Sequence, residues 1–513
     1  MRRATVAYAV QQIDGSAIDA LGIRRLTSDS RAVRAGDTFA AYPGESRDGR
    51  DFIAQAIKAG AASVLWDAAG FHWKPAWRVR NLAVPRLRQK IGLIASHVVG
   101  RPSSRLWMVG VTGTNGKTSC SQWIAQAFNR LDRRCAVAGT LGNGFPDALE
   151  AGVNTTPDAA WLHGKLRDWN RDGASAVVME VSSHGLEQGR LNGVEFDVAL
   201  FTNLTRDHLD YHGTMANYRR AKARLFGWET LKWSVFNLDD QFGRVLARQS
   251  RQGCVLGYGF DRPGAASRRE PRVQGRNLRL APDGVSFDVI SPWGKAHVRG
   301  KVLGRFNASN LLGTLAVLLA SNTELSDAVR VLGELDAVPG RAERYGGGRG
   351  DAGPLVVVDY AHTPDALEKI LTTLREVGSR ARRAQITCVF GCGGDRDRGK
   401  RAMMGRIATR CADRVIVTSD NPRFEAPMAI IADILEGAAR DCVVIEDRER
   451  AVHEAIVTSA RGDIVVVAGK GHEPYQEIRG VRHPFSDADV VKAALARLPP
   501  LPQVPQVTKA VRS

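Results

Sequence analysis

The sequence has few cysteines, no long apolar run and no block of like charges, and each absence excludes a class of protein. Its seven cysteines are scattered, without the spacing of a disulfide framework or a zinc site. The longest apolar stretch, residues 310–321, is shorter than the roughly 18 to 20 residues that a membrane-spanning helix needs. Basic residues near the start precede no apolar segment, which argues against a secretion signal. We therefore expect a cytoplasmic protein without membrane insertion.

One global property is unusual, a formal net charge of +18 over 513 residues. Such an excess indicates polyanionic ligands, which are either nucleic acid or small substrates with several phosphates and carboxylates. The basic residues are spread along the chain, and no aromatic-basic RNA motif or helix-turn-helix signature accompanies them. Charge alone does not choose between these ligands.

The length predicts about three domains. Apolar strands alternate with helical segments from Leu106 onward, as expected of a sheet with crossover helices. We expect an α/β protein with a small α/β domain at 1–103, a central domain like the P-loop ATPases at 104–339, a C-terminal Rossmann-like open sheet at 340–497 and a disordered proline-rich tail at 498–513. Strands of the mostly parallel third sheet are predicted at 355–359, 386–390, 414–418, 443–445 and 464–468.

The segment LWMVGVTGTNGKTS, residues 106–119, has the strand, glycine-rich turn and helix of a phosphate-binding loop. Backbone N–H groups and the Lys117 charge would bind phosphates, and the Thr118 hydroxyl could ligate magnesium. The loop is a variant, because the common pattern needs glycine where this chain has Val111. ATP contacts are predicted for Gly113, Thr114, Asn115, Gly116, Lys117, Thr118 and Ser119.

Polar residues also follow two later apolar strands. Glu180 ends one of them and is followed by His184, and the next strand leads into Asn203, Asp207, His208 and Asp210. A lone histidine is more often structural than catalytic. Polar groups at successive strand ends favour function, because ligands bind at that edge of open α/β sheets.

The apolar run at 414–417 leads into Asp420-Asn421-Pro422-Arg423. An Asn-Pro pair is a turn signal, and proline disfavours helix at the preceding residue. On this segment alone, the simplest interpretation is a stiff surface loop that has no role in function.

Several segments together resemble the Mur ligase family over nearly the whole chain. They are GVTGTNGKTS (110–119), NTTP (154–157), EVSSHGL (180–186), TNLTRDHLDYHG (202–213), YRRAKARLF (218–226), GRFNASNLLG (304–313), GRAERY (340–345), VVVDYAHTPDAL (356–367), GCGGDRDRGKR (391–401) and AGKGHEPYQ (468–476). The resemblance implies an ATP-dependent bacterial ligase that adds the third peptide residue to a UDP-muramoyl dipeptide, a cell-wall precursor, through an acyl phosphate. Its partners would be small-molecule substrates rather than nucleic acid, and we expect a monomer.

The resemblance also implies the residues that perform the chemistry. The catalytic residues would be Lys117, Glu180, His208 and Lys222. Magnesium would be bound by Thr118, Glu180, His208 and Lys222, the last as a carbamate. Without the resemblance, Lys222 would be interpreted as a solvated charge on a basic helix.

Substrate contacts follow from the same resemblance. Adenine and ribose would be held by Asn307, Asn310, Arg341 and Asp359. The UDP-muramoyl dipeptide would contact Ser28, Ser30, Glu45, Ser46 and Arg47 in the first domain, and Asn154, Thr155, Thr156, Ser182, Gln188 and Arg190 in the central domain.

In this family, Asp-Asn-Pro-Arg is associated with meso-diaminopimelate, which differs from lysine by a carboxylate at its far end. A guanidinium binds a carboxylate through two parallel hydrogen bonds, so Arg423 would bind that group. Asp420 and Asn421 would orient the amino group, and Pro422 would stiffen the turn. The remaining contacts would be Arg396, Gly469 and Glu473.

Three alternatives remain open. Folylpolyglutamate synthase uses similar chemistry, but DSRAVRAGD at 29–37 resembles the uridine-binding first domain of the Mur ligases instead. Charge together with a phosphate loop also fits a nucleic-acid-dependent ATPase, although no acidic run closes a strand as in motor proteins. The third alternative is a non-catalytic nucleotide-binding protein.

Overall fold

The computed structural model describes residues 13–45, 47–260, 271–281, 283–347, 351, 353–378 and 384–498. Ser46, a predicted substrate contact, and residues 499–513 of the predicted tail lie outside the described residues. The chain divides into two compact units, of which the first comprises residues 1–277, 287–298 and 309–335, and the second 278–286, 299–308 and 336–513. Within the described part of the chain, no helix combines the length and apolarity needed to cross a bilayer.

The first unit begins with a four-stranded parallel sheet that has helices on both faces. It contains β1 (Leu26–Thr27), β2 (Thr38–Ala41), β3 (Ser63–Trp66) and β4 (Arg80–Ala83) in that order, with α1 (Gly15–Ala20), η1 (Ser30–Ala32), η2 (Gly49–Phe52), α2 (Ile53–Lys58) and α3 (Leu87–Val98). Phe39 packs in one core with α2, whereas Ala40 packs in another with α1 and α3. This alternation follows from the opposite directions of successive side chains in a strand.

The central sheet has eleven strands in the order β15-β14-β13-β12-β11-β10-β5-β9-β6-β7-β8. They are β5 (Trp107–Thr112), β6 (Cys135–Gly139), β7 (Gly142–Phe145), β8 (Ala148–Glu150), β9 (Ala176–Glu180), β10 (Val198–Phe201), β11 (Trp233–Asn237), β12 (Cys254–Gly259), β13 (Arg272–Ala281), β14 (Gly284–Ser291) and β15 (Gly294–Gly300). β5 lies between β9 and β10 and is parallel to both. The segments that follow these three strands therefore meet at one edge of the sheet.

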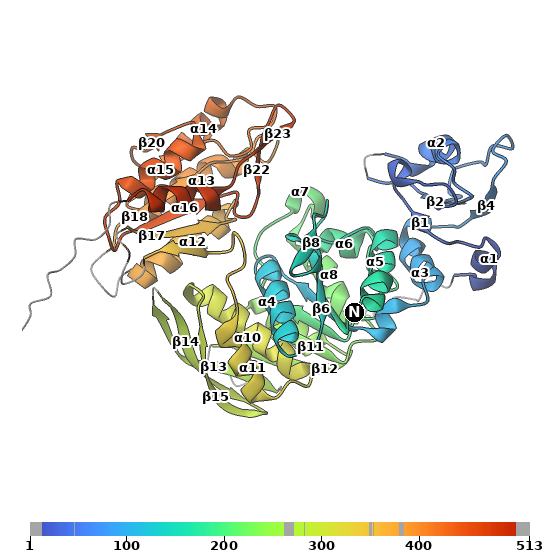
Figure 1. Ribbon diagram of the computed structural model, residues 1–513, viewed down its shortest axis with the longest axis horizontal. Coiled ribbons are helices and arrows are strands. Elements are labelled where there is room, and N and C mark those ends of the chain that lie inside the picture. Colours follow the sequence, from blue (N-terminus) through green and yellow to red (C-terminus); the bar gives the residue numbers. More distant parts are fainter. Residues whose placement is uncertain are drawn as a thin grey trace, which may run out of the picture. The chain divides into compact units, whose positions relative to one another are not determined.

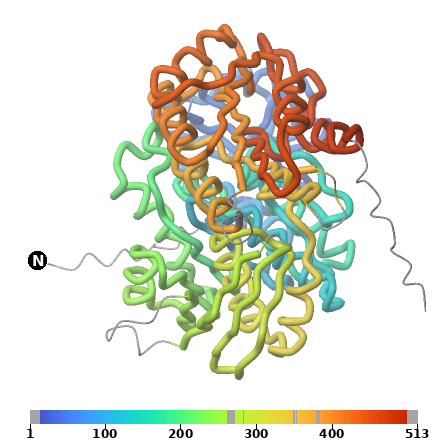
Figure 2. Tube along the Cα trace, turned by 90° about the vertical axis from the view of Figure 1, so that its left-hand side faces the viewer, coloured from blue at the N-terminus to red at the C-terminus, as the bar shows by residue number. Residues whose placement is uncertain are grey.

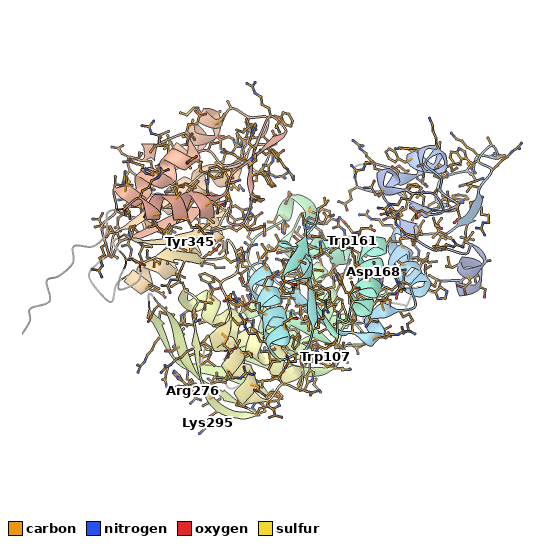
Figure 3. All side chains as sticks on the ribbon, viewed as in Figure 1. Trp107, Trp161, Asp168, Arg276, Lys295 and Tyr345 are labelled. Carbon is orange, nitrogen blue, oxygen red and sulfur yellow. The ribbon has the colours of Figure 1, made fainter. Side chains whose placement is uncertain are left out.

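Helices and short 3₁₀ turns connect and cover these strands. They are η3 (Pro102–Arg105), α4 (Lys117–Arg130), α5 (Ala159–Arg171), α6 (Ser183–Glu187), α7 (Leu209–His212), α8 (Met215–Ala223), η4 (Arg224–Gly227), α9 (Gln241–Gln249), α10 (Gly304–Ala320) and α11 (Leu325–Glu334). Trp107 at the start of β5 donates from Nε1 to Ser321 Oγ at 2.9 Å, and Trp161 and Asp168 mark α5 (Figure 3). The apolar stretch at 310–321 is accounted for by burial, because most of it lies within α10.

The second unit contains a six-stranded sheet in the order β16-β17-β21-β18-β19-β20. Figures 1 and 2 draw this part of the chain in orange to red. Its elements are β16 (Glu343–Gly346), β17 (Leu355–Asp359), α12 (Pro364–Gly378), β18 (Ile386–Phe390), α13 (Gly399–Cys411), β19 (Arg414–Val417), α14 (Pro427–Leu435), β20 (Val443–Val444), α15 (Arg448–Val457), β21 (Ile464–Ala468), the antiparallel hairpin β22 (Tyr475–Ile478) and β23 (Val481–Pro484), and α16 (Asp487–Ala496). Val357 packs in the core with α12, α13 and α14, and Val358 in the core with α15 and α16. The sheet is therefore covered on both faces.

The predicted strands of this sheet are confirmed. Three have the predicted bounds, and β19 and β20 each end one residue earlier than predicted. The antiparallel edge strand β16 was not predicted. Leu498, assigned to the tail by sequence, packs against the core that contains Val358.

Candidate active site

The predicted phosphate loop lies between β5 and α4. Gly116, with φ of +84°, immediately precedes the helix, and a Cβ there would lie 2.5 Å from Asn310 Oδ1. Lys117 donates from Nζ to the carbonyls of Gly113 at 3.0 Å and Thr114 at 2.9 Å. Val111 is a buried residue of β5 paired with Glu180 and Leu200, so the departure from the common pattern falls within the strand.

The residues that follow β10 hold this loop in place through hydrogen bonds. Asn203 accepts at Oδ1 from the N–H of Asn115 at 3.0 Å and donates from Nδ2 to the Asn115 carbonyl at 3.0 Å. Thr202 donates to the same carbonyl at 2.6 Å. Ser119 is buried in the first turn of α4. The loop conformation is therefore held from the neighbouring strand.

Glu180, the last residue of β9, is buried against the start of α4. Its carboxylate accepts from Thr118 Oγ1 at 3.0 Å and from the Thr140 N–H at 2.8 Å and hydroxyl at 3.2 Å. The structure thus brings together two of the four predicted magnesium ligands, a hydroxyl and a carboxylate. Oxygen donors of this kind suit magnesium.

Lys222 is buried on α8, although Arg219 and Arg220 beside it are exposed. Its Nζ donates to the Gly113 carbonyl at 2.7 Å and lies 4.7 Å from the Tyr218 ring centroid. Burial, and then the charge of Lys117, hold the pKa of Lys222 well below its ordinary value, and Asp207 opposes them. The interpretation of Lys222 as a solvated charge is therefore wrong.

His208 lies at the start of α7 with φ of +52°. Its Nε2 is 3.3 Å from Asp207 Oδ2, and its ring centroid is 4.9 Å from that of His184. Within the described ranges, no group of three histidine, cysteine, aspartate or glutamate side chains is arranged to hold a metal ion. A magnesium site here would thus depend on other oxygen ligands.

The predicted nucleotide residues divide between the two units. Asn310 lies beside Gly116 in the first, whereas Asn307, Arg341 and Asp359 belong to the second. The Arg341 guanidinium carbon is 4.5 Å from the Tyr360 ring centroid. Asp359 Oδ2 accepts from the Ala342 N–H at 2.7 Å, and burial raises the Asp359 pKa against the effect of Arg341.

The predicted contacts for the UDP-muramoyl dipeptide form a series of hydrogen bonds within the first unit. Glu45 accepts from Tyr211 at 2.7 Å, and Gln188 donates to Tyr211 at 3.4 Å. Arg190 donates to Gln188 at 2.8 Å and to the Thr156 carbonyl at 2.7 Å. Further bonds join Thr156 to Ser182, Thr155 to Thr140, and Ser28 to Asp158. Ser30 is half-buried, and Arg47 and Asn154 are exposed.

The loop after β19 is more than a stiff surface turn, because Asp420 and Asn421 are buried. Asn421 donates from Nδ2 to Glu473 Oε2 at 2.8 Å. Gly469, with φ of +119°, would bring a Cβ within 2.7 Å of Asp420 Oδ2. Arg423 adopts φ of +51° and donates from Nη1 to the Gly394 carbonyl at 2.7 Å. Of the predicted amino-acid contacts, Arg396 alone is exposed.

Comparison with known proteins gives matches along most of the chain. Family models match for "Mur ligase family, catalytic domain" at residues 22–98, "Mur ligase middle domain" at 111–318 and "Mur ligase, glutamate ligase domain" at 340–471. The UDP-N-acetylmuramoyl-L-alanyl-D-glutamate--2,6-diaminopimelate ligase of Chromobacterium violaceum is 52% identical over 93% of this chain and 94% of its own length. The chain belongs to the Mur ligase family. It is therefore an ATP-binding ligase with the three domains of that family.

Two further Mur ligases agree with this assignment. The protein of the same description from Nitrosomonas europaea is 48% identical over 92% of this chain and 93% of its own. A solved structure, again of that description, has a TM-score of 0.67 and 38% identity, and the match covers 92% of this chain and 95% of that one.

Several residues at the Mur ligase site were not predicted from the sequence. Lys470 is fully buried and donates to Asn421 Oδ1 at 3.1 Å and Glu473 Oε2 at 3.0 Å. Thr140, Tyr211 and Asp158 complete the contacts around Glu180, Glu45 and Ser28. Asp158 had a visible signal, because it follows the NTTP segment and caps α5. Lys470 lies in the AGKGHEPYQ segment beside the predicted Gly469, but nothing in the sequence indicates its burial or its contact with Asn421.

Proposed function

We propose that the chain joins meso-2,6-diaminopimelate to UDP-N-acetylmuramoyl-L-alanyl-D-glutamate, forming ADP and phosphate in peptidoglycan precursor synthesis. The proposal is carried by whole-chain identities of 48% and 52% to proteins so described. Asp420 and Asn421, in the loop that the family resemblance assigns to the amino acid, are buried and support it.

The chemistry must activate a carboxylate, which is a poor electrophile. The D-glutamate side-chain carboxylate attacks the γ-phosphorus of ATP, and ADP leaves. The diaminopimelate amine attacks the resulting acyl phosphate, phosphate leaves, and the amine loses a proton. The protein then needs mainly to position groups and neutralise charge.

The residues of the first unit suit the phosphate end of this reaction. Lys117 and the N–H groups at the start of α4 would bind the β- and γ-phosphates. Thr118 and Glu180, whose oxygens are 3.0 Å apart, would hold magnesium together with those phosphates. The metal would supply charge neutralisation there. His208 would bind a second magnesium with Lys222 in its carbamate form.

The three regions would divide the substrates. Residues 1–103 would bind the uridine end, 104–339 ATP and the dipeptide, and 340–497 the amino acid and part of the nucleotide. We also propose that the protein acts as a monomer in the bacterial cytoplasm.

ADP release, measured with the muramoyl dipeptide and each candidate amino acid, tests the function. We expect release with diaminopimelate and much less with lysine. Folate with glutamate, RNA and DNA serve as controls. Stimulation by nucleic acid alone, or no release with any amino acid, would contradict the proposal.

A further inference from the structure

Glu425 lies two residues beyond Arg423 and collects four hydrogen bonds on its carboxylate. It accepts from the Asp395 N–H at 2.6 Å and from Arg398 at 2.9 Å. Arg401 donates to both oxygens, at 2.8 and 3.0 Å. A carboxylate with this many charged and backbone donors is fixed in place.

These bonds join two loops that follow neighbouring strands. The glycine loop, residues 391–398, follows β18, and the amino-acid loop, residues 420–423, follows β19. Gly394 donates its N–H to the Asn421 carbonyl at 2.9 Å. A Cβ at Gly394 would lie 2.0 Å from the Pro422 carbonyl oxygen, so the two backbones touch. A small shift of one loop therefore displaces the other.

Both loops contain a residue in a strained backbone conformation. Asp395 and Arg423 each have φ of +51°, in the left-handed region that is unfavourable for a residue with a Cβ. Glu425 contacts both positions. Its carboxylate accepts from the Asp395 N–H, and its own N–H donates to the Pro422 carbonyl at 3.0 Å, closing the turn around Arg423.

Arg401 anchors Glu425 from α13. Its side chain is fully buried, and it also donates to Asp433 on α14 at 2.7 Å. A buried guanidinium requires its carboxylate partners, because an unpaired buried charge is strongly destabilising. The position of Glu425 is thus set by a helix rather than by solvent. Asp433 shares the guanidinium from a different element.

We propose that Glu425 is a positioning residue that holds the glycine loop and the amino-acid loop in register, so that Arg396 and Arg423 act on the same amino acid. Glu425 would thereby set the preference for diaminopimelate over lysine. This inference rests on the function proposed above.

Glu425→Gln, with Asp433→Asn as its matched control, tests the role. Each substitution removes one carboxylate charge from Arg401, but only Glu425 is bonded to both loops. We expect Glu425→Gln to raise KM for diaminopimelate about 10- to 100-fold, with KM for ATP within about twofold. The kcat/KM ratio of diaminopimelate to lysine should fall. Asp433→Asn should leave the KM for diaminopimelate and the kcat/KM ratio near the wild-type values. Glu425→Gln and Asp433→Asn should both lose thermal stability.

Glu425→Asp keeps the charge with one methylene less and covers the case in which Glu425→Gln does not fold. It should raise KM for diaminopimelate without loss of folding. Equal KM values in the variants of Glu425 and Asp433 would overturn the positioning role alone. A wild-type chain that releases no ADP with diaminopimelate would overturn the proposed function as well.

Discussion

At the scale of single residues, the amine of Lys222 is the group whose protonation matters most to the proposed mechanism. Its pKa is lowered by burial and by Lys117, which favours the neutral amine that carbon dioxide can convert to a carbamate. The buried Nζ also lies 2.7 Å from the Gly113 carbonyl, beside the phosphate loop. The modification would turn a cation that repels magnesium into an oxygen ligand.

We predict that Lys222→Ala lowers kcat by about 100-fold or more, because a charge-stabilising group is lost from the phosphate end of the site. Acetate or formate should restore part of the activity by replacing the carbamate. Arg220→Ala, an exposed residue of the same helix, is the control and should remain active. Near-normal turnover by Lys222→Ala would argue against the carbamate.

The second residue-scale prediction concerns Arg423. Lysine would leave its guanidinium without the far carboxylate, with the Gly394 carbonyl and, at 3.6 Å, the Glu477 carboxylate beside it. A site built to bind a polar group can reject an analogue that lacks it by about 10⁴-fold. Arg423→Ala should therefore lower kcat/KM for diaminopimelate by about 10²-fold or more, with a small effect on KM for ATP. Arg479→Ala, which removes an exposed guanidinium from the adjoining hairpin, should have little effect. If Arg423→Ala impaired the use of diaminopimelate and of ATP equally, the role of the loop would be structural.

Residues with a chemical role of their own were easier to predict than residues that hold them. Asp420 and Asn421 belong to a recognisable segment, so their proximity to Gly469 and Glu473 could be expected. Glu425 and Lys470 act through partners, and those of Glu425 are 24 to 30 residues away in sequence. No local spacing predicts the partners of the Glu425 carboxylate.

At the scale of elements, the turn between β5 and α4 depends on Gly116. Alanine there would place a Cβ 2.5 Å from Asn310 Oδ1 and adopt φ of +84°. We predict that Gly116→Ala weakens ATP binding at least about tenfold in calorimetric titration, since the N–H groups would no longer face the phosphates. Gly164→Ala on α5, where a Cβ meets nothing within 4 Å, should bind ATP normally. Unchanged affinity in Gly116→Ala would exclude this loop as the phosphate site.

α5 provides a prediction of pH dependence. His163 is fully buried, its Nε2 is 3.0 Å from the Asn192 carbonyl, and burial lowers its pKa to about 4. Below pH 6.5 the His163 imidazole binds a proton in the unfolded chain but stays neutral in the folded chain. The free energy of unfolding therefore decreases as the pH is lowered. Between pH 7 and pH 4, wild-type unfolding free energy should drop about 3 kcal/mol more than that of His163→Gln. If the unfolding free energies of wild type and His163→Gln, both measured in urea, changed equally with pH across this range, the lowered pKa of His163 would be contradicted.

Strands were predictable where a continuous apolar run meets turn signals on both sides, as at β17, β18 and β21. Such runs are typical of parallel strands that are buried on both faces. β16 and the hairpin β22–β23 were not predicted, because their half-buried or exposed residues have no long apolar run. These elements are held by neighbours rather than by their own composition.

At the scale of the whole molecule, the prediction of three domains agrees with the three larger sheets and with three family matches. The boundaries near 103 and 339 remain proposals. The first compact unit contains the first domain and most of the central domain, and Ala159 and Ala160 of α5 pack in the same core as α1 and α3. Sequence patterns describe elements one at a time and cannot reveal such joint cores.

The net charge of +18 provides the prediction for the molecule as a whole. The muramoyl dipeptide and ATP are polyanions, whereas diaminopimelate, with two ammonium and two carboxylate groups, has no net charge. Raising KCl from 0.1 to 1 M shortens the Debye length from about 10 to about 3 Å and screens attraction over longer distances. KM for both anionic substrates should rise several-fold, and KM for diaminopimelate by less than about twofold.

Steady-state kinetics with one substrate varied at a time measure these changes, and sucrose at matched osmolality controls for effects on water activity. Because Asp420 and Asn421 of the amino-acid loop are buried, screening should affect the binding of diaminopimelate least. An equal rise in all three KM values would show that salt perturbs the folded enzyme itself, and the charge excess would then have no part in substrate capture. A rise confined to the two polyanions would assign the excess charge to their recruitment.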